Sequence, residues 1–172
     1  MPKTTLDNLN AMDEDAFVSA IGHVFEHSPW IARRTYPKRP FDSVSTLHEK
    51  LVATVRVADE SEKLSLIRAH PDLVGRMARE GALTRESTAE QRAAGLTTLS
   101  SAEVQQFDGY NAAYHERFGF PFIICARENR KDAILAAFPV RLKNNVGQEI
   151  DTALGEIYKI ARLRLIDAID ED

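Results

Sequence analysis

The sequence predicts an all-α fold, a single compact domain of about eight helices, several of them short. Three observations predict it. Apolar residues recur every three or four positions through most of the chain, and capping signals such as Ser100-Ser101-Ala102-Glu103 precede these stretches. One apolar run, FPFIICA at residues 120–126, lacks this spacing and has no second run to pair with as a strand. We therefore expect FPFIICA to be an extended connector that crosses the core.

Length and composition limit the classes of protein to which the chain can belong. The 172 residues fit one domain, 1–172, and 44% of them are apolar, which is enough for a core. The 22 basic and 26 acidic residues leave a formal net charge of −4, so no basic surface for nucleic acid is expected. No apolar run reaches the roughly 20 residues of a membrane span. The expectation is a cytoplasmic protein without nucleic-acid or membrane partners.

The helices are predicted from capping residues, prolines and glycines. Residues 6–12 are expected to be a lead-in, and residues 72–79 to form a turn or two of helix before Gly81. The other helices are expected over these ranges: from Asp13 to about His27, from Ser28-Pro29 to about Tyr36, from Ser43 or Ser45 to Ala58, from Asp59 or Ser61 to Ala69, from Ser87 to about Ala94, from Ser100 to Gly119, 129–142, and from Val146 to about Ala168.

His70 is the first candidate for catalysis. Pro71 pushes the preceding residue out of the α region, so His70 is expected to end a helix with its ring held in place. An imidazole exchanges protons near neutral pH, and Glu90, twenty residues on, is the strongest candidate to partner it. Two structural readings stay open. A histidine at a helix C-terminus can serve only the helix dipole, and Ser87-x-x-Glu90 fits a capping box.

The apolar connector and its cysteine allow two readings each. The buried backbone of FPFIICA needs hydrogen-bond partners, so the segment is either a pocket wall that meets a polar ligand or a tight link between helices. Cys125 is the only cysteine and lies in this run, which favours a buried, inert thiol over a hydrolase nucleophile. His23 and His27 are four residues apart, but no third candidate ligand lies at a spacing typical of metal sites, so no metal site is expected.

The last helix places an arginine on its apolar face. At 100° per residue, Arg164 falls near the middle of the broad apolar face, whereas Arg162 falls on the polar side. A buried guanidinium is costly unless its charge is matched. Three alternatives stay open: an internal salt bridge, a side chain whose stem reaches to water, or a clamp for a planar anion such as a substrate carboxylate.

Several long strings resemble one family, the 2-oxo-4-hydroxy-4-carboxy-5-ureidoimidazoline (OHCU) decarboxylases, which form (S)-allantoin at the end of urate breakdown. The resemblance covers nearly the whole chain. It is carried by four stretches: HPDL at 70–73, LTRESTAEQRAAGL at 83–96, FDGYNAAYHERFGFPFIICAR at 107–127, and EIYKIARLRLIDAI at 156–169.

The resemblance implies an all-helical homodimer without cofactor or metal, and a functional association with a 5-hydroxyisourate hydrolase. It implies that His70 is the proton donor and that Glu90 acts beside it. The residues that it implies for substrate binding are Pro71, Ser87, Gln91, Phe122, Ile123, Ile124, Cys125, Ala126 and Arg164. Two alternatives remain: a helical interaction module without catalysis, and a paralogue acting on a related ureido acid.

Overall fold

The computed structural model describes residues 2–171, except for the side chains of Arg76 and Met77. The elements are β1 Thr4–Thr5, α1 Leu6–Ala11, α2 Glu14–Ile21, the 3₁₀ helix η1 Gly22–Val24, α3 Trp30–Thr35, η2 Tyr36–Lys38, α4 Val44–Arg56, α5 Glu60–Ala69, α6 Arg76–Arg79, α7 Arg85–Ala93, α8 Ser101–Phe118, η3 Ala126–Glu128, α9 Lys131–Arg141, α10 Val146–Ala168 and β2 Ile169–Asp170. The prediction of a mostly helical domain is confirmed, since the strands of this part of the chain have two residues each. None of its helices is long and apolar enough to cross a membrane.

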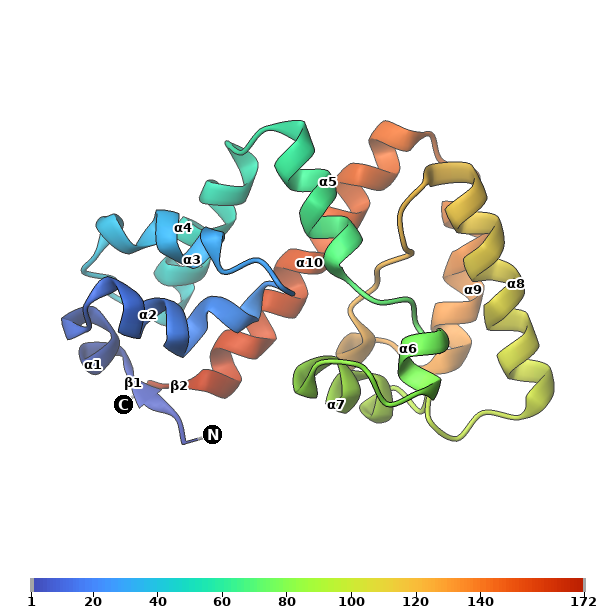
Figure 1. The fold of residues 1–172 in the computed structure, drawn as a ribbon, viewed down its shortest axis with the longest axis horizontal. Helices are drawn as coiled ribbons and strands as arrows, with labels where there is room; N and C mark the ends of the chain where they lie inside the picture. The colour runs from blue at the N-terminus through green and yellow to red at the C-terminus, as the bar shows by residue number, and fades with distance from the viewer. Residues whose placement is uncertain (1, 172) are drawn as a thin grey trace. The chain divides into compact units, whose positions relative to one another are not determined.

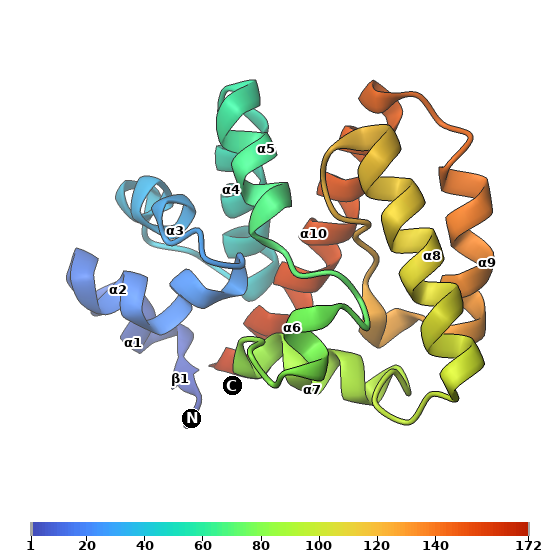
Figure 2. The same ribbon diagram turned by 45° about the vertical axis from the view of Figure 1, so that its right-hand side comes forward.

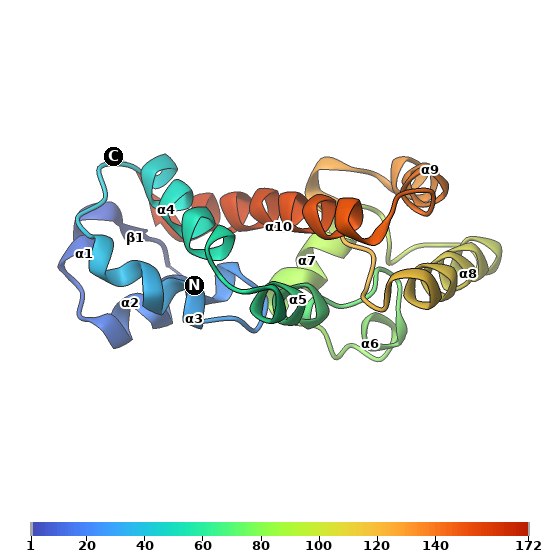
Figure 3. The ribbon, with the colours of Figure 1, turned by 90° about the horizontal axis from the view of Figure 1, so that it is seen from above.

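The described residues form two compact units. The first contains the chain up to Ala69 and the chain from Tyr158 onward, and the second runs from His70 to Ile157. α10 is an unbroken helix of 23 residues that contributes to both (Figure 3). His70, Glu90 and FPFIICA therefore belong to the second unit, and Arg164 belongs to the first.

In the first unit, α3 packs against both α2 and α4 (Figure 1). The buried ring of Phe17 lies 5.4 Å from the ring of Tyr36, edge to face, and 6.0 Å from the ring of Phe41. β1 and β2 pair in parallel, with Thr4 opposite Ile169. These contacts join the start of the described chain to its end.

In the second unit, α8 and α9 run side by side in the same direction (Figure 2). Lys131 Nζ lies 2.8 Å from Glu103 Oε2 at the start of both helices, and Arg117 Nη2 donates to the Asn144 carbonyl at 2.7 Å near the end of both. Two parallel neighbours need a return segment that spans about one helix length, and an extended chain covers this with the fewest residues. This requirement explains why FPFIICA is extended.

The connector prediction is confirmed. Residues 120–125 form neither helix nor strand, and η3 begins at Ala126. All seven residues of the connector are buried. The Phe122 ring stacks on Phe138 of α9 with centroids 3.8 Å apart, and it meets Tyr114 of α8 edge to face at 5.4 Å. The core of the second unit is therefore formed around the return segment.

Four predicted helix starts are confirmed by their hydrogen bonds. The side chains of Asp13, Ser43, Asp59 and Ser100 each accept a bond from a backbone N–H three residues on. Ser100 and Glu103 form the full capping box. α8 ends at Gly119, whose φ of +76° is the left-handed conformation expected of a terminating glycine.

The helix boundaries in the first 30 residues correct the prediction. Residues 6–11 form α1, not a lead-in, and the helix after Asp13 ends at Ile21, where η1 replaces it. Ser28 does not cap α3, because its hydroxyl donates to the Glu26 carbonyl. A proline can begin a helix without a side-chain cap, since it has no N–H to satisfy.

α7 begins one turn earlier than predicted. The Thr84 hydroxyl accepts the bond from the Ser87 N–H at 3.2 Å, so Thr84 is the cap and Ser87 lies inside the helix. The capping-box reading of Ser87 and Glu90 is therefore wrong. As a result, Ser87 and Gln91 stand one turn apart on the buried side of α7, with Glu90 half-buried beside them.

Candidate functional site

The segment after His70 is held by the side-chain amide of Gln91. Gln91 Oε1 accepts from the Val74 N–H at 3.1 Å, and Gln91 Nε2 donates to the Asp72 carbonyl at 3.3 Å. The oxygen and the nitrogen of one buried amide thus both hydrogen-bond the backbone of this segment. Gln91 therefore has a positioning role that the sequence did not indicate, beside the substrate contact that the resemblance implies.

α8 holds the same segment from a second side. Asn111 Nδ2 donates to the Leu73 carbonyl at 2.9 Å, and His115 Nε2 lies 2.7 Å from Asp72 Oδ1. Val74 has a φ of +57°, which is rare for a β-branched residue and persists only where the surroundings impose it. The contacts from α7 and α8 provide that constraint and fix the chain that follows His70.

His70 itself is a buried side chain with 8% of its surface exposed. It follows directly on α5, as Pro71 predicted. Burial removes competing water from an imidazole and suits it to proton transfer with a bound molecule. Its role as a proton donor stays a prediction.

α7 brings the Ser87, Glu90 and Gln91 positions near the end of the connector. α7 packs against η3, the turn that begins at Ala126. Ser87 and Gln91 are buried. Within the second unit, the structure therefore gathers the segment after His70, the inner side of α7 and the end of FPFIICA, three stretches that lie far apart in the sequence.

The polar backbone of the connector is bonded to side chains of the chain itself. Arg141 Nη1 donates to the Ile123 carbonyl, the Cys125 N–H donates to Glu156 Oε1 at 3.3 Å, and Asn129 Nδ2 donates to the Cys125 carbonyl at 3.0 Å. These three backbone groups are therefore bonded as expected of a tight link between helices. That the segment also forms a pocket wall stays a prediction.

Cys125 is a buried free thiol, as expected from its apolar run. Burial, with the nearby Glu128 charge as a second cause, raises the pKa of Cys125 to about 11. A nucleophilic cysteine needs a thiolate at neutral pH. The hydrolase alternative is therefore disfavoured.

Arg164 is buried on the apolar face of α10, with 3% of its surface exposed, while Arg162 is exposed. Its Nη2 lies 2.9 Å from Glu26 Oε2, and its Nη1 donates to the His23 carbonyl at 3.2 Å. The matching charge that the helix predicted is thus supplied by a buried carboxylate of the first unit. A substrate contact of Arg164 stays a prediction.

Sequence reasoning missed three buried charged residues of the second unit, namely Arg141, Glu149 and Glu156. A signal was present for the two glutamates. They are seven residues apart on α10 and share its apolar face with Ala153. The helical wheel that singled out Arg164 therefore also identifies them.

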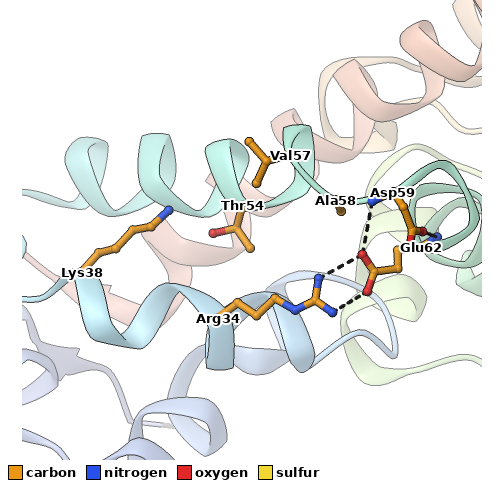
Figure 4. A pocket seen from close by; sticks show the side chains of 7 residues that line it. All are labelled: Arg34, Lys38, Thr54, Val57, Ala58, Asp59 and Glu62. Atoms are coloured by element: carbon orange, nitrogen blue, oxygen red, sulfur yellow. Dashed lines mark hydrogen bonds and ion pairs between the residues drawn. The ribbon is translucent and has the colours of Figure 1, made fainter.

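A separate hollow of about 420 Å³ lies in the first unit and contains none of the predicted site residues (Figure 4). The Arg34 guanidinium at this hollow is paired with both oxygens of Glu62, and it also lies 4.5 Å from the centroid of Trp30. Its charge is already matched, so we do not consider this hollow the candidate site. The described residues contain no group of three or more His, Cys, Asp or Glu placed to hold a metal ion.

Comparison with known proteins decides the family. The sequence model of the family described as OHCU decarboxylase matches residues 10–166. The chain belongs to the OHCU decarboxylase family. Membership places it among the carboxy-lyases, enzymes that break a bond between carbon and a carboxylate. That the domain extends over residues 1–172 stays a prediction.

Relatives match the OHCU decarboxylase-family chain over most of its length. It is 40% identical to the 2-oxo-4-hydroxy-4-carboxy-5-ureidoimidazoline decarboxylase of Haloferax volcanii over 100% of both chains. It is 41% identical to the uric acid degradation bifunctional protein PucL of Bacillus subtilis, over 97% of this chain but 33% of PucL.

Two solved structures share the fold. An (S)-allantoin synthase has a TM-score of 0.79 at 29% identity, covering 97% of this chain and 54% of that one. An OHCU decarboxylase in the presence of (S)-allantoin has a TM-score of 0.68 at 22% identity, covering 91% and 97%, and supports the fold alone.

Replacing Gln91 with leucine is expected to lower the free energy of unfolding by about 2 kcal/mol, because the Val74 N–H and Asp72 carbonyl lose their partner. Gln106→Leu, at an exposed position of α8, is the matched control and should change it by less than about 0.5 kcal/mol. Urea unfolding of both variants measures the difference. Equal stabilities would contradict the positioning role of Gln91.

The native protein is expected to react slowly with iodoacetamide at pH 8. A pKa of about 11 instead of 9.0 leaves Cys125 with about a hundredfold less thiolate than an ordinary cysteine. The urea-unfolded chain is the control, because unfolding restores the usual pKa. Alkylation at the same rate in both states would contradict the burial of this thiol.

Proposed function

We propose that the chain decarboxylates OHCU to (S)-allantoin in urate degradation, with His70 delivering the proton that fixes the product's configuration. The observation that carries the proposal is the end-to-end similarity to the Haloferax volcanii decarboxylase. Inside the second unit, a buried imidazole next to a fixed backbone segment supports the role of His70.

The substrate can accept the electrons released by decarboxylation. Its carboxylate is attached to a carbon that bears a hydroxyl and adjoins a ring C=N. When the C–CO₂ bond breaks, CO₂ leaves and the electron pair moves into the ring toward the imine nitrogen. The electron pair left by CO₂ forms a C=C bond to the ureido-bearing carbon. That carbon then takes one proton, the hydroxyl oxygen becomes the carbonyl of allantoin, and the hydroxyl proton goes to the former imine nitrogen. The enzyme's task is to hold the ring and to supply that proton on one face.

Each predicted site residue has a role in this scheme. His70 is the proton donor, and Glu90 either orients its imidazole or hydrogen-bonds the ureido or hydroxyl group. Arg164 offsets the substrate anion. The residues proposed to line the bound substrate are Pro71, Ser87, Gln91 and Phe122 through Ala126.

The proposal includes a cytoplasmic homodimer that acts without cofactor or metal. It also includes a functional association with a 5-hydroxyisourate hydrolase. The PucL match supports a pathway association, because its name describes a bifunctional protein of urate degradation and this chain covers only 33% of it. Turnover of freshly generated OHCU, followed by circular dichroism of the product, tests the activity and separates it from that of a paralogue or a non-catalytic module.

His70→Asn is expected to lower kcat by at least about a hundredfold, because asparagine keeps a hydrogen-bonding group but cannot carry the proton. Allantoin that still forms in this variant should lose its single handedness, since OHCU also decays without the enzyme. His48→Asn is the matched control, because His48 bonds the Tyr158 carbonyl in the first unit. Turnover unchanged from the parent would remove His70 from the mechanism.

Arg164→Lys is expected to raise KM about tenfold, because an ammonium lacks the two-pronged contact of a guanidinium. A fall in thermal stability alone, with KM and kcat intact, would leave Arg164 only its ion pair with Glu26. Arg164→Met combined with Glu26→Gln removes both buried charges, so KM can be measured without an unmatched carboxylate. Substrate titration and thermal melting of both variants give the two readouts.

A further inference from the structure

We infer that Arg141 and Glu149 are positioning residues that fix the backbone of the FPFIICA connector and so set the affinity for substrate. The inference rests on the proposed function, in which Phe122 through Ala126 line the bound substrate. It adds two residues, 18 and 26 positions beyond Ile123 in the chain, to the machinery of that site.

The argument begins with the backbone of the connector. Residues 120–126 are buried, and 120–125 lie in no helix or strand; η3 pairs the carbonyls of Cys125 and Ala126, but not the peptide groups on either side of Ile124. A buried peptide group without a partner costs free energy comparable to a lost hydrogen bond. Side chains that bond this backbone therefore decide where it lies.

Arg141 bonds the middle of the connector in two ways. Its Nη1 donates to the Ile123 carbonyl, and its Cζ lies 4.1 Å from the centroid of the Phe122 ring. A guanidinium stacked on an aromatic face and bonded to the adjacent carbonyl fixes both the position and the plane of that peptide. Arg141 has 7% of its surface exposed, so water screens these contacts little.

Glu149 matches the charge of Arg141 and holds its guanidinium. Arg141 Nε donates to Glu149 Oε1 at 2.8 Å, and Glu149 is fully buried. Tyr114 donates its hydroxyl to the same oxygen at 2.6 Å, and Asn144 Nδ2 donates to Oε2 at 2.9 Å. Burial first, and then the bond to Glu149, raises the pKa of Tyr114, so its hydroxyl stays a donor. Side chains of α8 and of the α9–α10 turn thus fix the carboxylate.

Glu156 holds the connector at a second point, one peptide group further along. The Cys125 N–H donates to its Oε1, so the two peptide groups that flank Ile124 are both bonded on the side of α9 and α10. In a trans peptide the N–H and C=O point in opposite directions. The N–H and C=O of Ile124 therefore point to the other side, where a donor–acceptor pair on one residue fits an amide or ureido group.

The variant Arg141→Met with Glu149→Gln tests this arrangement. It removes both charges together, and glutamine keeps an oxygen for the Tyr114 hydroxyl, so no buried charge is left unmatched. We expect iodoacetamide to alkylate Cys125 about tenfold faster in the native variant, because the connector opens more often. We expect KM for OHCU to rise about tenfold as well, with a smaller change in kcat. Arg117→Met is the matched control, because Arg117 bonds the Asn144 carbonyl in the same region but not the connector.

Three outcomes decide the inference. Unchanged Cys125 alkylation in a folded double variant overturns the anchoring role. Faster alkylation with an unchanged KM overturns the link to substrate binding. A parent chain without activity on OHCU defeats the proposed function instead, while alkylation still tests the anchor.

Arg141→Lys covers the case in which the double variant does not fold. Lysine keeps the charge opposite Glu149 but cannot bond both Glu149 and the Ile123 carbonyl in the planar geometry of a guanidinium. The same two changes are expected in this variant, and their absence overturns the inference.

Discussion

The second unit depends on one constraint, the need to satisfy an extended backbone inside a helical core. Since α8 and α9 run in the same direction, the chain must return between them, and it does so through buried apolar residues. Helices satisfy their own backbone groups, but a single extended segment cannot. Arg141, Glu156 and Asn129 supply bonds from outside, which makes the position of the connector depend on charged and amide side chains.

Each unit buries one arginine against one glutamate, Arg164 with Glu26 and Arg141 with Glu149. Such pairs are poor sources of stability, because taking two charges out of water offsets most of their attraction. Their geometric effect is larger. A paired guanidinium keeps a fixed plane and bonds a chosen carbonyl, His23 in one unit and Ile123 in the other. Both arginines therefore hold a helix at a fixed distance from another part of the backbone, the short turn η1 in one unit and the extended connector in the other.

The sequence predicted the features that depend on near neighbours. A cap followed three residues later by glutamate identified the start of α8, and the lack of helical spacing identified the connector. α7 was misplaced because Thr84-x-x-Ser87 and Ser87-x-x-Glu90 are both acceptable caps, and only packing selects between them. The partner of Arg164 was not predictable, because Glu26 lies at the other end of the chain and only folding brings the two together. For the candidate site, the sequence suggested the strings around His70, Glu90 and the connector, which stay predictions, but not the side chains that support them.

The left-handed backbone of Val74 places a cost on the segment after His70. A β-branched residue in this conformation loses about 1–2 kcal/mol, which glycine would not. The Val74 side chain is also buried, with 4% of its surface exposed, so glycine at this position would relieve the backbone but lose the packing of that side chain. If a Val74→Gly variant unfolds at a higher temperature but turns over more slowly, the strained backbone keeps the segment after His70 rigid at the expense of thermal stability.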